Sequence, residues 1–267
     1  MNTEILILIV AVAWSVSVEA IGSGNYISIT EAPYYVAIDD KWYKYTQETN
    51  YCGGSILSEH WVITAAHCAD HFQRVPMRAR TGGTTQLGHG EYHEVEKVVV
   101  HPDYEDSFVA ELDTAIGHND IALLKLRAPI SFSTYQQPIQ LSSKPPAIND
   151  TVSLVGLGIE GQSADSASLK ETQMRVGTLD DLDPKWIPTF VVTTDEHSAA
   201  CAGDSGGPVV GDDNELVGIL VMASGCRDWW RRSVEQFNFV TPVYVYYDWI
   251  VEHTGLGYAT SGGSPRS

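Results

Sequence analysis

Short apolar segments separated by turn residues recur along most of the chain. Several alternate between apolar and polar positions, others are runs rich in Val and Ile, and Gly, Pro, Asn and Asp stand between them. This pattern predicts antiparallel strands of a sandwich or barrel. The long amphipathic helices that a parallel α/β fold requires are missing. The predicted strands are 33–38, 53–58, 61–66, 93–100, 121–126, 151–158, 188–193, 215–222 and 237–244.

One helix is predicted, near the end of the chain. Over residues 244–253, the apolar side chains of Tyr246, Trp249 and Ile250 share a helical face, and Gly255 follows as a stop. The remaining residues, 255–267, are rich in Gly and Ser and are expected to be disordered.

The first 20 residues predict a signal peptide. An apolar run extends from Ile5 to Val18, and the small residues Val18 and Ala20 occupy the two positions that a signal peptidase reads. The run is shorter than the roughly 20 apolar residues that span a bilayer. We therefore expect a secreted, extracellular protein with no membrane association after cleavage.

Four cysteines lie beyond the predicted signal, which in a secreted chain favours two disulfides. Of the three pairings, proximity in sequence favours Cys52 with Cys68 and Cys201 with Cys226. The sequence contains no Cys-x-x-Cys motif, which disfavours a metal site. Asn149 begins an Asn-Asp-Thr sequon in a polar stretch, which predicts glycosylation of a surface loop.

The charge balance excludes one class of partner. The chain has 34 acidic and 16 basic residues, a formal net charge of −18, so phosphate backbones would be repelled. The length of 267 residues with 43% hydrophobic composition suits one domain, and we expect a monomer that does not bind nucleic acid.

Three motifs point to nucleophilic catalysis. In chain order they are TAAHC with His67, DIAL with Asp120, and GDSGGP with Ser205. A serine hydroxyl attacks only when an imidazole takes its proton, and the imidazole needs a carboxylate to fix its tautomer. His67, Asp120 and Ser205 supply these three roles.

The motifs, in this order and spacing, resemble those of the chymotrypsin-like (trypsin-fold) serine peptidases. The resemblance runs from about Ile21 to His253, and CGGSIL, HPDY and DWI add to it. It implies an all-β fold of two six-stranded antiparallel β-barrels, over roughly 21–134 and 135–245, and a short C-terminal helix to residue 254. It also implies His67 as general base, Asp120 as its orienting carboxylate, and an oxyanion hole made by the N–H groups of Gly203 and Ser205.

The resemblance also gives a role to Asp204. In this family, cleavage frees a new α-amino group that pairs with the Asp that precedes the nucleophile. The residue of this chain that would carry this amino group is Ile21. The residue before it is Ala20, where relatives carry Arg or Lys, so we hypothesise that signal removal itself exposes Ile21. The alternative is earlier cleavage followed by trimming of a very short propeptide.

The residues aligned with the substrate pocket predict its preference. Ala199 stands at the pocket floor, where trypsin-like enzymes carry Asp, and Ala223 and Asn238 stand at its walls. We therefore expect cleavage after small or medium apolar residues and not after Arg or Lys. Val221 replaces a Ser whose hydroxyl supports the triad Asp in relatives.

The function expected from this resemblance is a secreted serine endopeptidase. Its partners would be protein or peptide substrates and protein protease inhibitors. No cofactor or metal is expected, because no acidic loop after His67 suits calcium. The alternative is a catalytically impaired homologue that acts as a binding or decoy protein.

Overall fold

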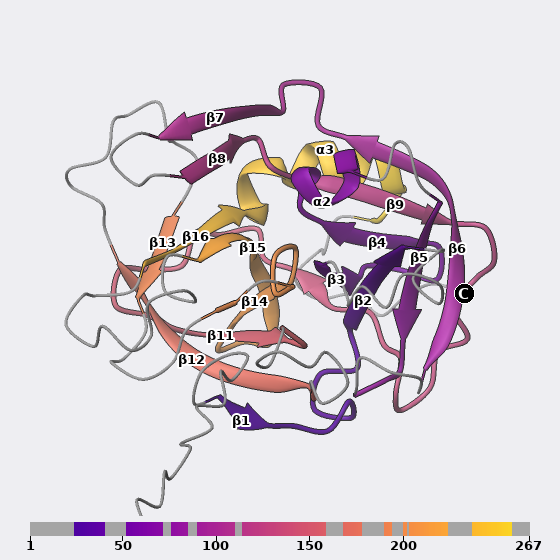
Figure 1. Cartoon of the computed structure of the whole chain (residues 1–267). Helices are drawn as coiled ribbons and strands as arrows, with labels where there is room; N and C mark the ends of the chain where they lie inside the picture. The colour runs from indigo at the N-terminus through magenta and orange to yellow at the C-terminus, as the bar shows by residue number, and fades with distance from the viewer. Residues whose placement is uncertain are drawn as a thin grey trace, which may run out of the picture.

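The computed structural model of the protein (Figure 1) describes residues 24–40, 52–71, 76–84, 90–109, 114–158, 168–177, 190–193, 200–201, 203–223 and 237–257. The predicted signal peptide and the predicted tail beyond residue 257 lie outside these ranges. No helix within the described ranges is long and apolar enough to cross a bilayer.

Six antiparallel strands close a first barrel, which lies on the right in Figure 1. Their alternating side chains bury Ile38, Ile56, Ile63 and Leu124 completely, because every second residue of a strand faces the interior. In order around the barrel the strands are β2 (Tyr35–Asp40), β3 (Cys52–Ile56), β4 (Trp61–Thr64), β9 (Ala122–Leu126), β6 (Glu91–Val100) and β5 (Met77–Thr81).

A second sheet of eight strands lies beside the first barrel. Pairing of β12 with β13 closes six of its strands into a ring. Around the ring they are β12 (Lys170–Gly177), β11 (Thr151–Gly156), β14 (Pro208–Gly211), β15 (Glu215–Ala223), β16 (Phe237–Pro242) and β13 (Phe190–Thr193). The short β1 (Asn25–Tyr26) adds to β12 and β10 (Gln140–Leu141) adds to β15, so β1 joins the second sheet although it precedes the first barrel in sequence.

A few further elements complete the fold. A short helix, α2 (Ala66–His71), follows β4, and the strands β7 (Glu105–Val109) and β8 (Thr114–His118) form a separate antiparallel pair. The chain ends in a 3₁₀ turn, η5 (Val243–Tyr246), and in α3 (Tyr247–Thr254).

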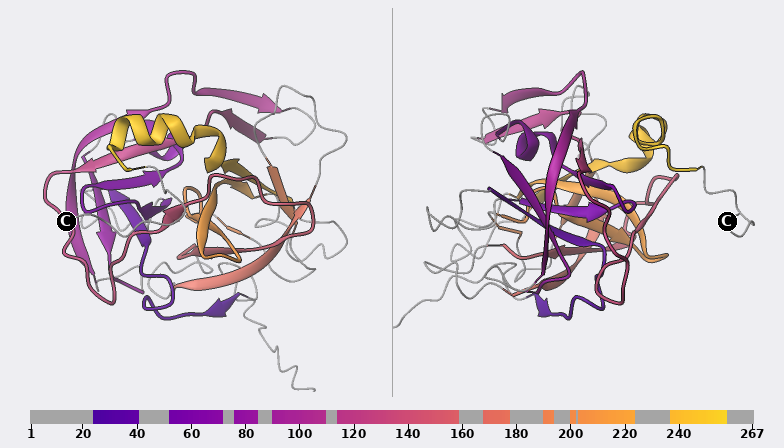
Figure 2. Two further views of the ribbon diagram at one scale, coloured as in Figure 1. Left: turned by 180° about the vertical axis from the view of Figure 1, so that it is seen from behind. Right: turned by 90° about the vertical axis from the view of Figure 1, so that its right-hand side faces the viewer.

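The C-terminal helix ends as predicted. Gly255 has a left-handed φ of 70°, and its N–H donates to the carbonyl of Val251, which caps the last turn. The buried side chains of Tyr246 and Ile250 join the core that contains the first barrel's residues. Viewed from behind in Figure 2, α3 therefore lies across the first barrel although it follows the last strand of the second sheet. The predicted all-β fold with a short C-terminal helix is confirmed.

Candidate active site

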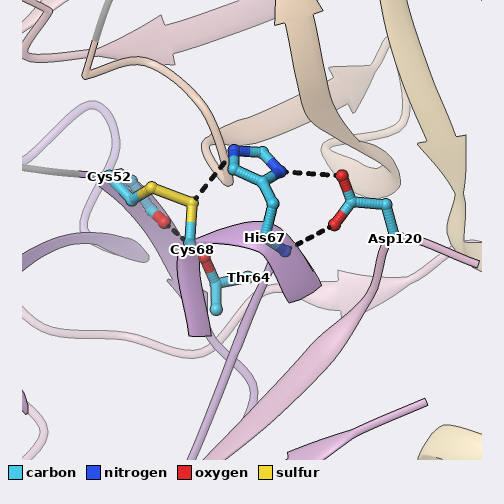
Figure 3. Close-up of a disulfide and its surroundings, with 6 residues drawn as sticks. Cys52, Thr64, His67, Cys68 and Asp120 are labelled. Atoms are coloured by element: carbon cyan, nitrogen blue, oxygen red, sulfur yellow. Dashed lines mark hydrogen bonds and ion pairs between the residues drawn. A yellow bond between two sulfur atoms is a disulfide. The ribbon is translucent and has the colours of Figure 1, made fainter. Parts of the chain in front are cut away.

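His67 and Asp120 are brought together because the end of β4 lies beside the start of β9. His67 lies in α2, directly after β4, and Asp120 lies just before β9, which pairs with β4. Oδ2 of Asp120 lies 2.7 Å from Nδ1 of His67, and Oδ1 accepts the backbone N–H of His67 at 2.9 Å. The Asp120 side chain is 2% exposed and that of His67 is 29% exposed. Figure 3 shows the carboxylate facing one edge of the imidazole.

This contact fixes the tautomer of the imidazole. An ionised carboxylate only accepts hydrogen bonds, so Nδ1 must carry the proton that lies between His67 and Asp120. In the neutral ring Nε2 then keeps a lone pair that can accept a proton. Since the backbone bond holds the second carboxylate oxygen, Asp120 has little freedom to rotate. The arrangement provides an oriented general base.

The predicted disulfide between Cys52 and Cys68 is present, next to His67. It ties α2 to β3, across a sequence separation of 16 residues. Cys201 is also disulfide-bonded, and its predicted partner Cys226 lies outside the described residues. The sulfurs of Cys52 and Cys68 lie close to the imidazole of His67, but disulfide sulfurs are not thiolates and do not suit a metal ion.

Ser205 lies in a tight turn that leads into β14. Two glycines of the turn have positive φ angles, 92° at Gly203 and 79° at Gly206, which other residues rarely adopt. The N–H of Gly206 donates to Leu220 of β15 at 2.6 Å. The turn is thereby held to the second sheet, and the Ser205 side chain is half-buried.

The same turn also contacts the first barrel. The carbonyl of Ser205 accepts the N–H of Gly53 in β3 at 2.7 Å. A Cβ on Gly206 would collide with the Thr64 hydroxyl and the Gly53 carbonyl, which are themselves hydrogen-bonded at 2.8 Å. Because Gly53 follows Cys52 and Thr64 precedes α2, the turn and His67 are fixed to the same part of the first barrel.

No hydrogen bond links the Ser205 hydroxyl to His67 in the part of the chain that is described. Nε2 of His67 instead lies 3.5 Å from Sγ of Cys68, as Figure 3 shows. Such contacts are often loose in free enzymes and shorten when substrate binds. Within the predicted triad, therefore, the pair of His67 and Asp120 is formed, and Ser205 sits on a turn docked beside it.

Asp204 lies beneath this turn and is completely buried. Its Oδ1 accepts the N–H of Gly158 and its Oδ2 the N–H of Cys201, each at 2.8 Å. Burial raises the pKa of Asp204 to about 6, whereas the two N–H groups and the charge of Lys170 act in the opposite direction. A Cβ on Gly156 would collide with the carboxylate, so the site has no room for a larger residue there. Its predicted partner Ile21 lies outside the described residues.

The predicted pocket residues are only partly within the described ranges. Asn238 is buried on β16, where its amide donates to the carbonyl of Val192 at 3.3 Å. Ala223 lies directly opposite Asn238 on β15 and is half-buried. Ala199, the predicted floor, lies outside the described residues. Val221 is buried on β15 and offers Asp120 no hydroxyl.

A second support of the Asp120 loop was not predicted from the sequence. The hydroxyl of Tyr246, at the end of η5, donates to Oδ1 of Asn119 at 3.0 Å, and Nδ2 of Asn119 donates to the carbonyl of Asp103 at 2.8 Å. Asn119 has a left-handed φ of 50°, which these two contacts hold in place. Burial and the charge of Asp120 both raise the pKa of Tyr246, so its hydroxyl stays protonated and able to donate. In the sequence, the position of Asn119 directly before Asp120 was the signal that could have indicated this contact.

We expect Tyr246→Phe to lower kcat by about 2- to 10-fold with little change in KM, because one hydrogen bond contributes about 0.5–1.5 kcal/mol. Without the hydroxyl, Asn119 is held less firmly. Asp120, the next residue, then holds the imidazole of His67 less firmly. The measurement is steady-state hydrolysis of a peptide ester, with Tyr244→Phe on the same 3₁₀ turn as the control. Equal kcat values for the two variants would contradict this role.

Comparisons with known proteins agree with this geometry. The chain is 29% identical over 245 residues to trypsin 5G1 of Aedes aegypti, an alignment that covers 87% of this chain and 84% of the relative. The family model described as Trypsin matches residues 21–250, which include both barrels and all three motifs. The chain therefore belongs to the trypsin family of serine endopeptidases.

Proposed function

We propose that this peptidase cleaves peptide bonds with His67, Asp120 and Ser205 as its catalytic triad. The observation that carries the proposal is the 2.7 Å contact between Nδ1 of His67 and the buried Oδ2 of Asp120. A proton held at Nδ1 leaves Nε2 as the acceptor on the side of the ring away from Asp120. The docking of the Ser205 turn on Gly53, next to the Cys52–Cys68 disulfide, gives further support.

The chemistry follows from these roles. Ser205 Oγ attacks the carbonyl carbon of the substrate while its proton passes to Nε2 of His67. The N–H groups of Gly203 and Ser205 are proposed to bind the oxyanion that forms. When the C–N bond breaks, Nε2 gives the proton to the leaving amine, and the acyl group remains on Ser205. A water molecule then attacks the acyl carbonyl while its proton passes to Nε2 of His67. Ser205 Oγ leaves with that proton, and the carboxylic acid is released.

The ion pair of Ile21 with Asp204 is proposed as the activation step. The buried Asp204 carboxylate supports this proposal, because its pKa is raised to about 6 by burial and a cation would stabilise its charged form. Removal of residues 1–20 by signal peptidase would expose the Ile21 amino group with no separate tryptic cleavage. N-terminal sequencing of active protein tests this step, and any mature residue other than Ile21 would refute it.

The proposed substrates have small or medium apolar residues at P1. The apolar side chain of Ala223 and the buried amide of Asn238, which lie opposite each other on β15 and β16, offer no charge for Arg or Lys. Cleavage-site profiling on a mixed peptide library would test this preference, and dominant cleavage after Arg or Lys would refute it.

We expect Ala223→Gly to shift the preference toward larger P1 residues. Loss of the methyl group widens the pocket, and a group of this size changes selectivity by about 1–3 kcal/mol, or roughly 10- to 200-fold. The measurement is the ratio of kcat/KM for Phe and Ala substrates. Ala147→Gly, in an exposed loop before β11, should leave that ratio unchanged.

The cellular setting is proposed from the sequence. A signal peptide, two disulfides and glycosylation at Asn149 fit a secreted, monomeric protein that meets protein substrates and inhibitors. Asn149 lies exposed in a turn before β11, where a glycan could be attached.

Two features favour the alternative of a non-catalytic binding or decoy protein. Val221 gives Asp120 no hydroxyl, and within the described ranges Ser205 donates no hydrogen bond to His67. Loose contacts of this kind are usual in free enzymes, and the two bonds to His67 hold Asp120 without the hydroxyl. Catalysis is therefore the function that the site supports best.

A further inference from the structure

His101 lies in a turn directly after β6, beside the loop that carries Asp120. Its backbone N–H donates to the carbonyl of Ile121 at 3.1 Å, and its carbonyl accepts the N–H of Tyr104 at 3.0 Å, which closes the turn. Its side-chain Nδ1 accepts the N–H of Asp103 at 3.2 Å. The imidazole of His101 therefore holds the backbone of its own turn, and this turn is attached to the residue that follows Asp120.

A second connection runs from the turn to the residue before Asp120. The carbonyl of Asp103 accepts Nδ2 of Asn119 at 2.8 Å, and Oδ1 of Asn119 accepts the hydroxyl of Tyr246 at 3.0 Å. The ring of Tyr246 contacts the imidazole of His101 edge-on, with 5.2 Å between the ring centroids and 76° between the planes. These contacts form a closed circuit that begins and ends at His101 and holds Asn119 in between.

The imidazole of His101 also contacts α3. The centroid of the Trp249 ring lies 5.1 Å from that of His101, and the ring of His253 lies 4.9 Å from that of Trp249. Nδ1 of His253 lies 2.8 Å from the carbonyl of Trp249, one helical turn before it. His101 is thus packed between the Asp120 loop and the C-terminal helix, and a second imidazole stands nearby.

Protonation of His101 would break the circuit. Nδ1 accepts the Asp103 N–H only while it keeps its lone pair, and in an imidazolium both ring nitrogens are donors. Burial lowers the pKa of His101, the charge of Asp103 in its own turn raises it, and the charge of His253 on α3 lowers it. Tyr246 on η5 stays a neutral phenol, because burial and the charge of Asp120 raise its pKa. The neutral imidazole is therefore the form that fits these contacts.

We propose that His101, in its neutral form, is a positioning residue for the Asp120 carboxylate, and that its protonation loosens the Asp120 loop and slows catalysis. The residues on both sides of Asp120 are held by the His101 turn and its circuit, Asn119 through its side chain and Ile121 through its carbonyl. His101 acts through Asp120 on the orientation of the His67 imidazole. The inference rests on the proposed function, since it concerns the proposed general base.

Two substitutions separate the lost hydrogen bond from the positive charge. His101→Asn keeps an acceptor for the Asp103 N–H, because an Asn side chain accepts the backbone N–H two residues further along, and it cannot be protonated. His101→Phe removes the acceptor and keeps a ring against Tyr246 and Trp249. For each protein, kcat and KM on a peptide ester are measured between about pH 5 and pH 9, together with the thermal midpoint. His101→Leu repeats the test if His101→Phe does not fold.

His60→Gln is the matched control. Like His101, His60 is half-buried, and its Nδ1 lies 3.3 Å from a backbone group, the carbonyl of Leu126. Leu126 ends β9, whereas Asp120 lies just before the start of that strand, so this contact is at the far end from the catalytic carboxylate. The control should follow the wild type in kcat at every pH.

At about pH 8 and above, where both imidazoles are neutral, His101→Phe should lower kcat by about 2- to 10-fold at unchanged KM, the loss expected for one hydrogen bond. His101→Asn should restore kcat to the wild-type value there. Toward about pH 5, protonation of His67 slows both the wild type and His101→Asn. The wild type should then fall a further 2- to 10-fold or so below His101→Asn, because only the wild type gains the second positive charge.

Three outcomes would overturn the inference. Equal kcat for His101→Phe and the wild type above about pH 8 would show that the circuit does not position Asp120. A ratio of kcat between His101→Asn and the wild type that is the same at every pH would show that protonation of His101 has no effect. Absence of hydrolysis by the wild type at every pH would refute the proposed function itself, and this inference with it.

Discussion

Ser205→Ala is expected to lower kcat by about 10⁶-fold, the largest loss of any single change in the chain. In the proposed mechanism the hydroxyl forms the covalent bond to substrate, and neither His67 nor Asp120 can replace it. Folding should be unaffected within about 0.5 kcal/mol, because the contacts of Ser205 to Gly53 use backbone atoms and the side chain is half-buried.

The measurement for this change is kcat on a peptide ester, together with the thermal midpoint of each variant. Ser143→Ala, at an exposed position far along the chain from the turn, is the control and should retain full activity. A residual kcat within about 100-fold of the wild type would mean that Ser205 is not the nucleophile.

Asp120→Asn is expected to lower kcat by about 10⁴-fold, because it leaves the imidazole of His67 in the wrong tautomer. The asparagine can still accept the His67 backbone N–H through its oxygen, so the loop geometry should survive. Its amide N–H then faces Nδ1 and turns that nitrogen into an acceptor. The proton moves to Nε2, which can no longer take the proton of Ser205.

A tautomer effect is distinguished from a folding effect by two readouts. KM and the thermal midpoint should stay close to the wild type while kcat falls. Asp212→Asn, in the exposed turn between β14 and β15, is the control. A large rise in KM or a loss of folding in Asp120→Asn would contradict the tautomer argument.

Strands rich in Val and Ile were predictable because their apolar residues recur at short intervals. The apolar runs predicted at 151–158 and 215–222 correspond to β11 and β15. Among the strands that were missed, β5 and β12 each carry a charged residue that the fold buries. In β5 the buried Arg80 lies 3.5 Å from the buried Asp39 of β2, and in β12 it is Lys170 that is buried. From the sequence alone, a charged residue predicts an exposed position. Its burial becomes apparent only when its neighbours in the fold are known.

The candidate site likewise contains residues that the sequence predicts and contacts that it does not. His67, Asp120 and Ser205 stand in motifs whose residues are contiguous in sequence, so the sequence alone predicts them. The contacts of Tyr246 with Asn119 and of Gly158 with Asp204 join residues far apart along the chain. They depend on strand register and on where the last helix packs, which no local pattern specifies.

Whether Ser205 is an activated nucleophile can be measured directly by covalent labelling. The protein is treated with a fluorophosphonate, its intact mass is recorded before and after, and the modified residue is located by peptide mapping. We expect one adduct per chain, on Ser205, in chains that begin at Ile21, and none in Ser205→Ala. Absence of an adduct on folded chains that begin at Ile21 would contradict it, and the non-catalytic function would take its place.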